Sequence, residues 1–251
     1  MKVLVMDFDG VIVDSMNEGL FNGFNAYIYF HPHTRLFGRG RFTFDNFNKI
    51  IKKYNNQYKK FRKLRCYLRT ALDYYYFFLA IEQIAKIKNV LDFDKFSEKS
   101  GMGYERYTKI FYLNRLEYMK HFDKWINLTP LFSFMKDYLK SSNLDNVFIS
   151  TSNRKSTVSN ILRYYKIKFP EKNIFDNQTS LDKMDHIKII KKRKNIEFHD
   201  IYFIDDQVRI LIELKKLGVK CHLAGWGYNN EEQRKEAVRN GIDLIDKKFF
   251  R

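Results

Sequence analysis

KVLVMDFDGV, residues 2–11, is the strongest structural signal in the chain. It is a short, mostly apolar run that ends in Asp7 and is followed by Gly10. Such a run is typical of a central parallel strand, which is buried on both faces and whose carboxyl end carries functional loops. We therefore expect an α/β protein with acidic side chains at one edge of its sheet.

The second half of the chain alternates between apolar runs and amphipathic segments, as a doubly wound sheet does. Thr129-Pro130 predicts a helix start, because the hydroxyl can cap free amides and proline suits the first helical position, and this helix is expected to end near residue 140. The expected strands cover 146–149, 201–204 and 219–223, and the expected helices 155–165, 185–194, 208–217 and 231–240.

The segment 16–125 has a different character, with long helical stretches rich in Tyr, Phe and Lys and a single proline, Pro32. We interpret it as a helical domain inserted into the sheet domain. The expected division is therefore residues 1–15 and 126–251 for the sheet domain and 16–125 for the insert.

The chain carries 46 basic and 29 acidic side chains, a net charge of +17, so anionic ligands or surfaces would be attracted to it. The insert holds 21 basic and 10 acidic residues. Nine basic residues and no acid lie between Asp45 and Asp73, among apolar residues spaced by three and four, which predicts an amphipathic helix over Lys49–Arg69 with a basic face. Such a face is either simply solvated or attracts a phosphorylated or polymeric anion.

The two cysteines, Cys66 and Cys221, form no metal-binding or disulfide pattern. The apolar run Val3–Met6 is too short for a signal peptide, and Tyr74–Ile81 is far short of the roughly 18–20 residues that a membrane span requires. These features predict a cytoplasmic protein without a membrane partner.

Two acidic clusters follow apolar strands. Asp7, Asp9 and Asp14 follow the first strand, and Asp205 and Asp206 follow the strand expected at 201–204. Carboxylates this close repel one another unless a cation joins them, and Mg²⁺ prefers oxygen ligands. Each cluster alone could be a helix cap or turn, but two at the carboxyl ends of parallel strands predict one shared magnesium site.

Four motifs in order resemble those of the haloacid dehalogenase (HAD) superfamily, whose members are mostly Mg²⁺-dependent phosphatases. DFDGV at Asp7–Val11 is similar to the first motif and VFIS at Val147–Ser150 to the second. Lys183 is a suitable third-motif lysine, and FIDDQ around Asp205 and Asp206 resembles the acidic fourth motif. The resemblance implies a Rossmann-like (Rossmannoid) parallel sheet between helices, and an inserted helical cap that covers the site and chooses the substrate.

The resemblance also implies roles for individual residues. Asp7 is the expected nucleophile that forms an aspartyl-phosphate, and Asp9 the general acid and base. Ser150 and Lys183 are expected to hold the phosphoryl oxygens, together with Gly10, Thr151 and Asn153. Mg²⁺ is expected at Asp7, Asp9 through its carbonyl, Asp206 and, directly or through water, Asp205.

Two of these assignments, the lysine and the outer ligands of the metal, have alternatives. Lys188 is an alternative to Lys183, which we favour because it is expected to precede the helix. Ile210 stands where many relatives have a further acid, so Gln207 or Asn153 could supply polar contacts instead, although Asn153 is equally suited to a turn.

The expected function is a phosphatase that acts on a small phosphorylated metabolite. Asp9 argues against dehalogenation, which does not need that acid. Two alternatives stay open. A phosphomutase would use the same residues if water were excluded, and a nucleic-acid-binding protein or nucleic-acid-end phosphatase would use the basic insert.

Overall fold

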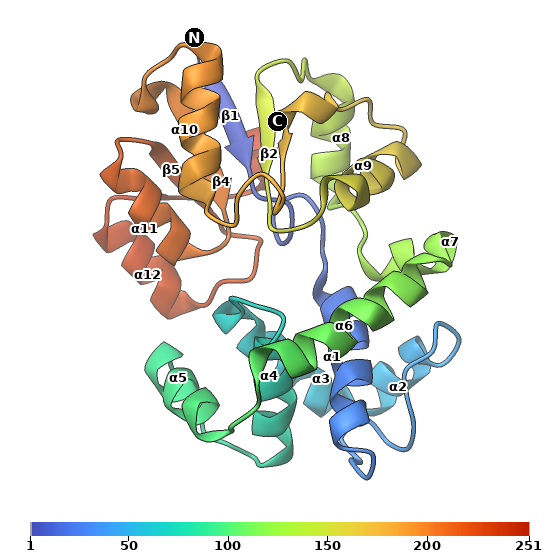
Figure 1. Ribbon diagram of the computed structural model, residues 1–251. Helices are drawn as coiled ribbons and strands as arrows, with labels where there is room; N and C mark the ends of the chain where they lie inside the picture. Colours follow the sequence, from blue (N-terminus) through green and yellow to red (C-terminus); the bar gives the residue numbers. More distant parts are fainter. Residues whose placement is uncertain (1, 251) are drawn as a thin grey trace. The chain divides into compact units, whose positions relative to one another are not determined.

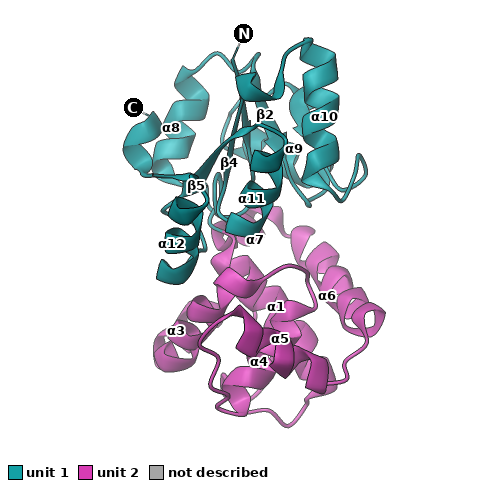
Figure 2. Cartoon of the chain, turned by 90° about the vertical axis from the view of Figure 1, so that its left-hand side faces the viewer, with its two compact units in different colours: residues 1–14, 130–251 teal, residues 15–129 magenta. Residues whose placement is uncertain are grey.

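The chain forms two compact units in the computed structural model, which describes residues 2–250. Residues 1–14 and 130–251 form the core unit, and residues 15–129 form the helical unit (Figure 2). Both connections between the units fall at the ends of this insert, after Asp14 and before Pro130.

The core unit contains a parallel six-stranded sheet with the order β3-β2-β1-β4-β5-β6. The strands are β1 (Val3–Met6), β2 (Val147–Ser150), β3 (Ile174–Phe175), β4 (Ile201–Asp205), β5 (Lys220–Ala224) and β6 (Asp243–Ile245). The α/β fold class expected from the sequence is confirmed. The strands β3 and β6 were not expected, because two or three residues are too few to form a recognisable pattern.

Helices cover both faces of this sheet, with α8 (Ser133–Ser141) and α9 (Lys155–Tyr164) on one side (Figure 1). The other side carries α10 (Lys183–Lys194), α11 (Val208–Lys216) and α12 (Glu231–Arg239). On this second side, the hydrophobic core contains alternate strand residues such as Val3, Val5 and Phe203. They pack with Ile187 of α10 and Leu211 of α11. Short 3₁₀ turns lie at Glu171–Asn173, Phe198–Asp200 and Lys247–Phe250.

The expected helix start at Thr129-Pro130 is wrong, because α8 begins at Ser133. The preceding residues pair instead with the loop after β1. The N–H of Asp14 donates to the carbonyl of Pro130 at 2.8 Å, and the N–H of Phe132 donates to the carbonyl of Ile12 at 3.1 Å. These extended contacts occupy the backbone that the predicted first turn would have used.

The strand order reverses beside β1. The chain moves from β1 to β2 and β3 on one side and then returns to β4 on the other. Such a reversal leaves a crevice at the carboxyl ends of the central strands, which is where open α/β sheets bind ligands.

The helical unit is built from seven α-helices and two 3₁₀ turns within its described residues. The helices are α1 (Met16–Phe30), α2 (Phe47–Lys53), α3 (Asn55–Leu64), α4 (Asp73–Glu82), α5 (Val90–Lys99), α6 (Tyr104–Met119) and α7 (Phe122–Trp125), and the turns cover Arg65–Tyr67 and Ile126–Leu128. Helix α1 packs against α4 and α6. Among residues 2–250, no helix is long and apolar enough to cross a bilayer.

Aromatic rings fill the interior of the helical unit. Phe21 and Phe24 of α1 both contact Phe42, and Phe61 of α3 stacks on Phe78 of α4 with centroids 5.4 Å apart. All five of these rings are fully buried. Burying large aromatic surfaces supplies most of the driving force for such a core.

The segment Lys49–Arg69 is not one amphipathic helix, which corrects the expectation. The chain breaks at Tyr54, whose φ of −103° and ψ of 41° are not helical, and α3 restarts at Asn55. The apolar side chains still point inward, since Phe47, Phe61 and Leu64 are buried. A break of one residue preserves the three-and-four spacing, so the sequence pattern did not reveal it.

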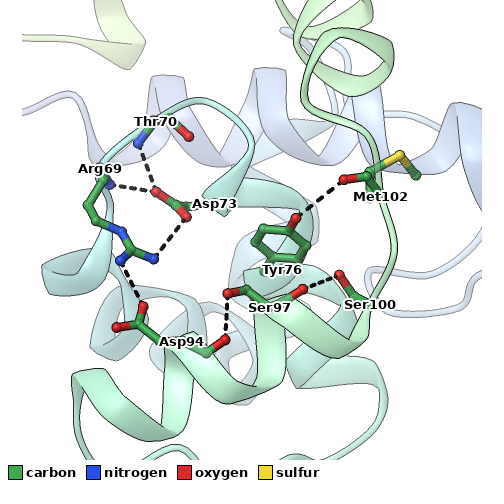
Figure 3. A network of polar contacts seen from close by, with 8 residues as sticks. All are labelled: Arg69, Thr70, Asp73, Tyr76, Asp94, Ser97, Ser100 and Met102. Atoms are coloured by element: carbon green, nitrogen blue, oxygen red, sulfur yellow. Dashed lines mark hydrogen bonds and ion pairs between the residues drawn. The ribbon is translucent and has the colours of Figure 1, made fainter.

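A polar network fixes the start of α4 against α5 (Figure 3). The Asp73 carboxylate accepts hydrogen bonds from the N–H groups of Arg69 and Thr70 at 2.7 and 2.8 Å. The Arg69 guanidinium in turn contacts Asp94 of α5 at 2.7 Å. The buried Asp73 thus satisfies backbone donors at a helix start, as capping residues do.

Candidate active site

The register of the sheet brings three strand ends together. Met6 of β1 pairs with Ile149 of β2 and with Ile204 of β4. The next residues, Asp7, Ser150 and Asp205, therefore lie at the same level on adjacent strands. The N–H of Asp7 extends the ladder by donating to the carbonyl of Ile204 at 2.9 Å.

Three buried carboxylates converge at this edge. Asp7, Asp205 and Asp206 each place one carboxylate oxygen within 4.8 Å of the others. The Nζ of Lys183, at the start of α10, lies 2.8 Å from Asp7 Oδ1 and 2.7 Å from Asp205 Oδ2. Three carboxylates and one ammonium leave a net charge of −2, which a divalent cation would balance.

The environment shifts the titration of both Asp7 and Lys183. Burial raises the pKa of Asp7 well above its usual range, Asp205 and Asp206 raise it further, and Lys183 opposes them. Burial alone would lower the pKa of Lys183, but the carboxylates of Asp205 and Asp7 outweigh it and raise that pKa. Lys183 is therefore a permanent cation that stabilises this acidic cluster.

Asp9 lies beside the cluster rather than in it. Its Oδ2 accepts a hydrogen bond from the Asn153 amide at 2.5 Å. Asn153 thus joins the loop after β2 to the loop after β1. Asp14 is turned to a different partner, because its Oδ1 accepts a hydrogen bond from the hydroxyl of Tyr228 at 2.7 Å.

Two glycines allow backbone to approach Asp206. Gly10 has a φ of +78°, and a Cβ there would lie 2.2 Å from Asp206 Oδ2. A Cβ at Gly227 would lie 2.3 Å from the Cβ of Asp206 and 2.7 Å from the carbonyl oxygen of Gly10. The carboxylate also accepts the N–H of Tyr228 at 2.7 Å. The turn at 225–227 therefore holds Asp206 in place, and the Trp226 side chain of this turn is half-buried.

Ser150 is paired with a histidine that sequence reasoning missed. Its Oγ lies 2.8 Å from Nδ1 of His186, and the exposed fractions of the two residues are 0% and 1%. Nε2 of His186 lies 3.1 Å from the carbonyl oxygen of Ser180, which can only accept. Burial lowers the pKa of His186, so the neutral ring donates from Nε2 and accepts at Nδ1. The Ser150 hydroxyl is thus the donor in this pair.

Thr151 offers a second hydroxyl one residue further on. It is buried, and its Oγ1 accepts the N–H of Asn153 at 3.1 Å. No described residue accepts the Thr151 hydroxyl proton through a hydrogen bond. Thr151 therefore has a donor left for a ligand, whereas the Ser150 donor is used by His186.

The structure separates the two candidate lysines. Lys188 pairs with Asp185 at 3.2 Å on the exposed side of α10, and 57% of its side chain is exposed, whereas Lys183 lies among the acids. Lys183 does not precede the helix as expected but is its first residue, and Asp182 caps it. Ile210 packs on the sheet core, and the N–H of Gln207 donates to Asp205 Oδ1 at 2.9 Å.

Two contributors to the site were absent from the sequence prediction. His186 follows Lys183 by three residues, which places both on one face of α10, and this spacing was the available signal. Tyr228 follows the Gly225-Trp226-Gly227 turn, and only the folded turn shows that it reaches Asp206 and Asp14.

Solved structures resemble the chain over nearly its whole length. The chain matches a putative phosphoglycolate phosphatase from Lactobacillus delbrueckii with a TM-score of 0.60 and 14% identity, covering 100% of this chain and 98% of that one. It matches a predicted phosphatase from Clostridium acetobutylicum with a TM-score of 0.57 and 17% identity, over 97% and 92% of the two chains. It matches a haloacid dehalogenase-like hydrolase from Streptococcus pneumoniae with a TM-score of 0.56 and 16% identity, over 98% of this chain and 93% of that one.

These likenesses establish a HAD-like fold, as the sequence motifs predicted. The chain matches no protein-family model and no curated protein by sequence.

Proposed function

We propose that the chain is a Mg²⁺-dependent phosphatase that hydrolyses a small phosphomonoester through an aspartyl-phosphate on Asp7. The observation that carries this proposal is the buried cluster of Asp7, Asp205 and Asp206 around Lys183 at the strand reversal. A buried carboxylate with a raised pKa, such as that of Asp7 among its acidic neighbours, is characteristic of catalytic sites. The phosphatase names of the structural neighbours support the same reaction class.

The donor set fits magnesium. Asp7, Asp206 and the carbonyl of Asp9 would hold the ion, and Asp205 would contact it directly or through water. Two donors, Lys183 and the N–H of Gln207, already occupy the oxygens of Asp205, which favours the water-mediated contact. When bound, Mg²⁺ supplies positive charge that screens the nucleophile from the anionic substrate.

Asp7 attacks the phosphorus atom in the first step. Lys183 holds Oδ1 of Asp7 at 2.8 Å, and no described residue donates a hydrogen bond to Oδ2. We therefore assign Oδ2 as the attacking atom. As the Asp7–phosphorus bond forms, the bond from phosphorus to the substrate oxygen breaks, and Asp9 gives its proton to the departing alkoxide.

Water attacks the aspartyl-phosphate in the second step. Asp9, now a carboxylate, takes a proton from the water, and the carboxylate of Asp7 leaves as inorganic phosphate forms. The Asn153 amide orients Asp9 for both proton transfers through its 2.5 Å hydrogen bond. One group thus acts as acid and then as base.

Lys183 and the hydroxyl of Thr151 are the proposed donors to the phosphoryl oxygens. Thr151 has an unused proton, whereas Ser150 donates to His186, so we give Ser150 the role of anchoring the end of β2. Gly10 lets the loop after β1 pass close to Asp206. Preorganised donors of this kind stabilise developing negative charge.

We propose a small phosphorylated metabolite as the substrate and the helical unit as the part of the chain that selects it. Two structural neighbours are named as phosphoglycolate phosphatases, which is an example of this substrate class. A phosphomutase would use the same residues but return the phosphoryl group to a sugar, so phosphate release distinguishes the two.

The decisive experiment measures inorganic phosphate released from a panel of phosphomonoesters by the purified chain, with and without Mg²⁺. We expect release that requires Mg²⁺, and Asp7→Asn should lower turnover by roughly 10³-fold or more, because an amide cannot act as this nucleophile. Thr151→Val should weaken turnover more than Ser150→Ala does once both variants are shown to be folded.

Asp14→Asn is the matched control. Asp14 lies in the same loop, but it binds the Tyr228 hydroxyl, and an amide oxygen can accept that hydrogen bond equally well. Its turnover should stay within about threefold of the unmodified chain. An Asp7→Asn protein that keeps nearly normal Mg²⁺-dependent phosphate release would rule out the nucleophile assignment.

A further inference from the structure

Ten exposed cations gather on one part of the helical unit, which we name the basic surface. It comprises Arg35, Arg39, Arg41, Lys49, Lys52, Lys53, Lys59, Lys60, Arg62 and Lys63. They come from the loop 35–41 and from helices α2 and α3. This surface accounts for most of the balance of +11 that the helical unit carries.

No acidic side chain neutralises these cations. Among the described residues, none of the ten forms an ion pair. The one acid between residues 35 and 72, Asp45, lies 3.5 Å from Lys124 instead. Elsewhere, exposed lysines such as Lys120 and Lys235 do pair with a nearby glutamate on or beside their own helix.

The helices also place like charges next to one another. Lys49 precedes Lys52 and Lys53 by three and four residues, and Lys59 precedes Arg62 and Lys63 by the same spacings. Side chains at these spacings share one face of a helix, where like charges destabilise it. An anionic partner would remove this repulsion, so the surface gains stability by binding one.

The loop that carries the three arginines is attached to both helices. The ring of Phe37 contacts the ring of Tyr54 at the junction of α2 and α3, with centroids 6.4 Å apart. Gly38 and Gly40, with φ values of +85° and +87°, turn the loop on either side of Arg39. Arginines presented in this way can hold phosphate oxygens in a bidentate manner.

The composition of the surface favours nucleic acid over a membrane. A peripheral membrane site combines cations with exposed apolar side chains that enter the lipid. No large apolar side chain among residues 35–64 is exposed. Exposed cations without exposed apolar side chains instead suit the phosphates of a nucleic-acid backbone.

We propose that the basic surface binds nucleic acid through its phosphodiester backbone, without reading bases. This inference is independent of the proposed phosphatase reaction, because none of its residues belongs to the candidate active site. Binding of this kind releases counterions, so the affinity should fall steeply as salt is raised.

The test measures binding of a fluorescently labelled oligo(dT) strand, and of a duplex, to the full chain by anisotropy at several salt concentrations. Two triple variants are compared. Lys59→Gln, Lys60→Gln and Lys63→Gln alter the basic surface, whereas Lys120→Gln, Lys216→Gln and Lys235→Gln remove the same charge from lysines that already pair with glutamates. All six side chains are exposed, so both variants should fold, which circular dichroism checks.

We expect the unmodified chain to bind with a slope of log K against log salt of about −3 or steeper. The surface variant should bind roughly tenfold or more weakly with a shallower slope, and the control variant should change by less than about threefold. Equal weakening by both variants would mean that only net charge matters, and would overturn the proposal. It would also be overturned by the absence of binding at low salt, or by binding to phosphatidylserine vesicles alone.

Discussion

In the core unit three buried acids lie around one lysine, which pairs with Asp7 and Asp205, whereas in the helical unit each of the two buried acids has an arginine as a partner. The Nζ of Lys183 lies 2.8 Å from Asp7 and 2.7 Å from Asp205. In the helical unit, Glu18 accepts from the Arg115 guanidinium at 2.8 Å and from the Asn22 amide. Asp73 accepts two backbone N–H groups and lies near Arg69 (Figure 3).

The difference separates structural from functional burial of charge. A buried charge that is paired and fully hydrogen-bonded can be carried at moderate cost, and it holds neighbouring segments in register. An excess of buried like charge costs stability and persists where function requires it. On this criterion Glu18 and Asp73 are structural, and the acids around Lys183 are the group for which we propose a bound cation and an anionic substrate.

The largest expected effect follows from removing the shared lysine. Lys183→Met removes the cation that pairs with the buried carboxylates of Asp7 and Asp205, so the free energy of unfolding should fall by about 3–5 kcal/mol. Turnover should fall by roughly 10²-fold or more, because a phosphoryl contact is lost. Chemical denaturation and phosphate release measure the two losses.

Magnesium gives this prediction a second readout. If the acids form the proposed site, added Mg²⁺ should raise the melting temperature of Lys183→Met, because the ion supplies the missing positive charge. A variant that is as stable as the unmodified chain without Mg²⁺ would contradict the idea that these carboxylates repel one another.

A smaller effect is expected from the matching change in the helical unit. Arg115→Met removes the cation from Glu18 but leaves the hydrogen bond from Asn22, so the free energy of unfolding should fall by about 2 kcal/mol. The response of the melting temperature to Mg²⁺ should be unchanged, because the proposed metal ligands lie in the core unit. Loss of that response would show that Arg115 contributes to the metal site, and would contradict the structural role assigned to Glu18 and Arg115.

The smallest effect concerns His222, a buried group of the core unit outside the site. Neither ring nitrogen has a hydrogen-bond partner among the described residues, and burial lowers the pKa of the imidazole. His222→Phe keeps the aromatic contact with Tyr202 and should be neutral or slightly stabilising at pH 7. Phosphate release should be unchanged.

The pH dependence follows from the sign of that shift. A histidine whose folded pKa is lowered binds fewer protons when folded than when unfolded, so stability falls as the pH drops below its ordinary value near 6.5. Burial outweighs the opposing effect of Asp243, so between pH 7 and 5.5 His222→Phe should lose less stability than the unmodified chain. Urea denaturation at both pH values measures the free energy of unfolding. An equal loss of this free energy in the two proteins would show that His222 does not titrate as stated.

Local patterns were sufficient to predict most of the core unit. Buried parallel strands are continuous apolar runs, so β1, β2, β4 and β5 could be located from composition alone. The runs that form β3 and β6 are too short for this signal. The helix start predicted at Thr129-Pro130 was wrong because the same local pattern also suits an extended segment. Hydrogen bonds to the loop after β1 favour the extended conformation.

The site was predictable only in part for a similar reason. The positions of Asp7, Asp205 and Asp206 after strands could be read directly, whereas the partners of Asp14 and Ser150 could not. Asp14 meets Tyr228 and Ser150 meets His186 across separations of 214 and 36 residues. Contacts between distant residues depend on crossovers and packing, which leave no periodic trace in the sequence.

Local residue patterns were enough to predict that acids follow two buried strands, that a helical insert separates them and that positive charge is concentrated in that insert. Buried strands, charge and the spacing of apolar residues are local properties, so they can be recognised from composition and periodicity. The folded chain was needed to show that β1 and β4 are neighbours, that Lys183 bridges two of the acids and that the Ser150 hydroxyl pairs with His186. Those outcomes depend on strand order and register, because a shift of one residue would turn each side chain to the opposite face of the sheet.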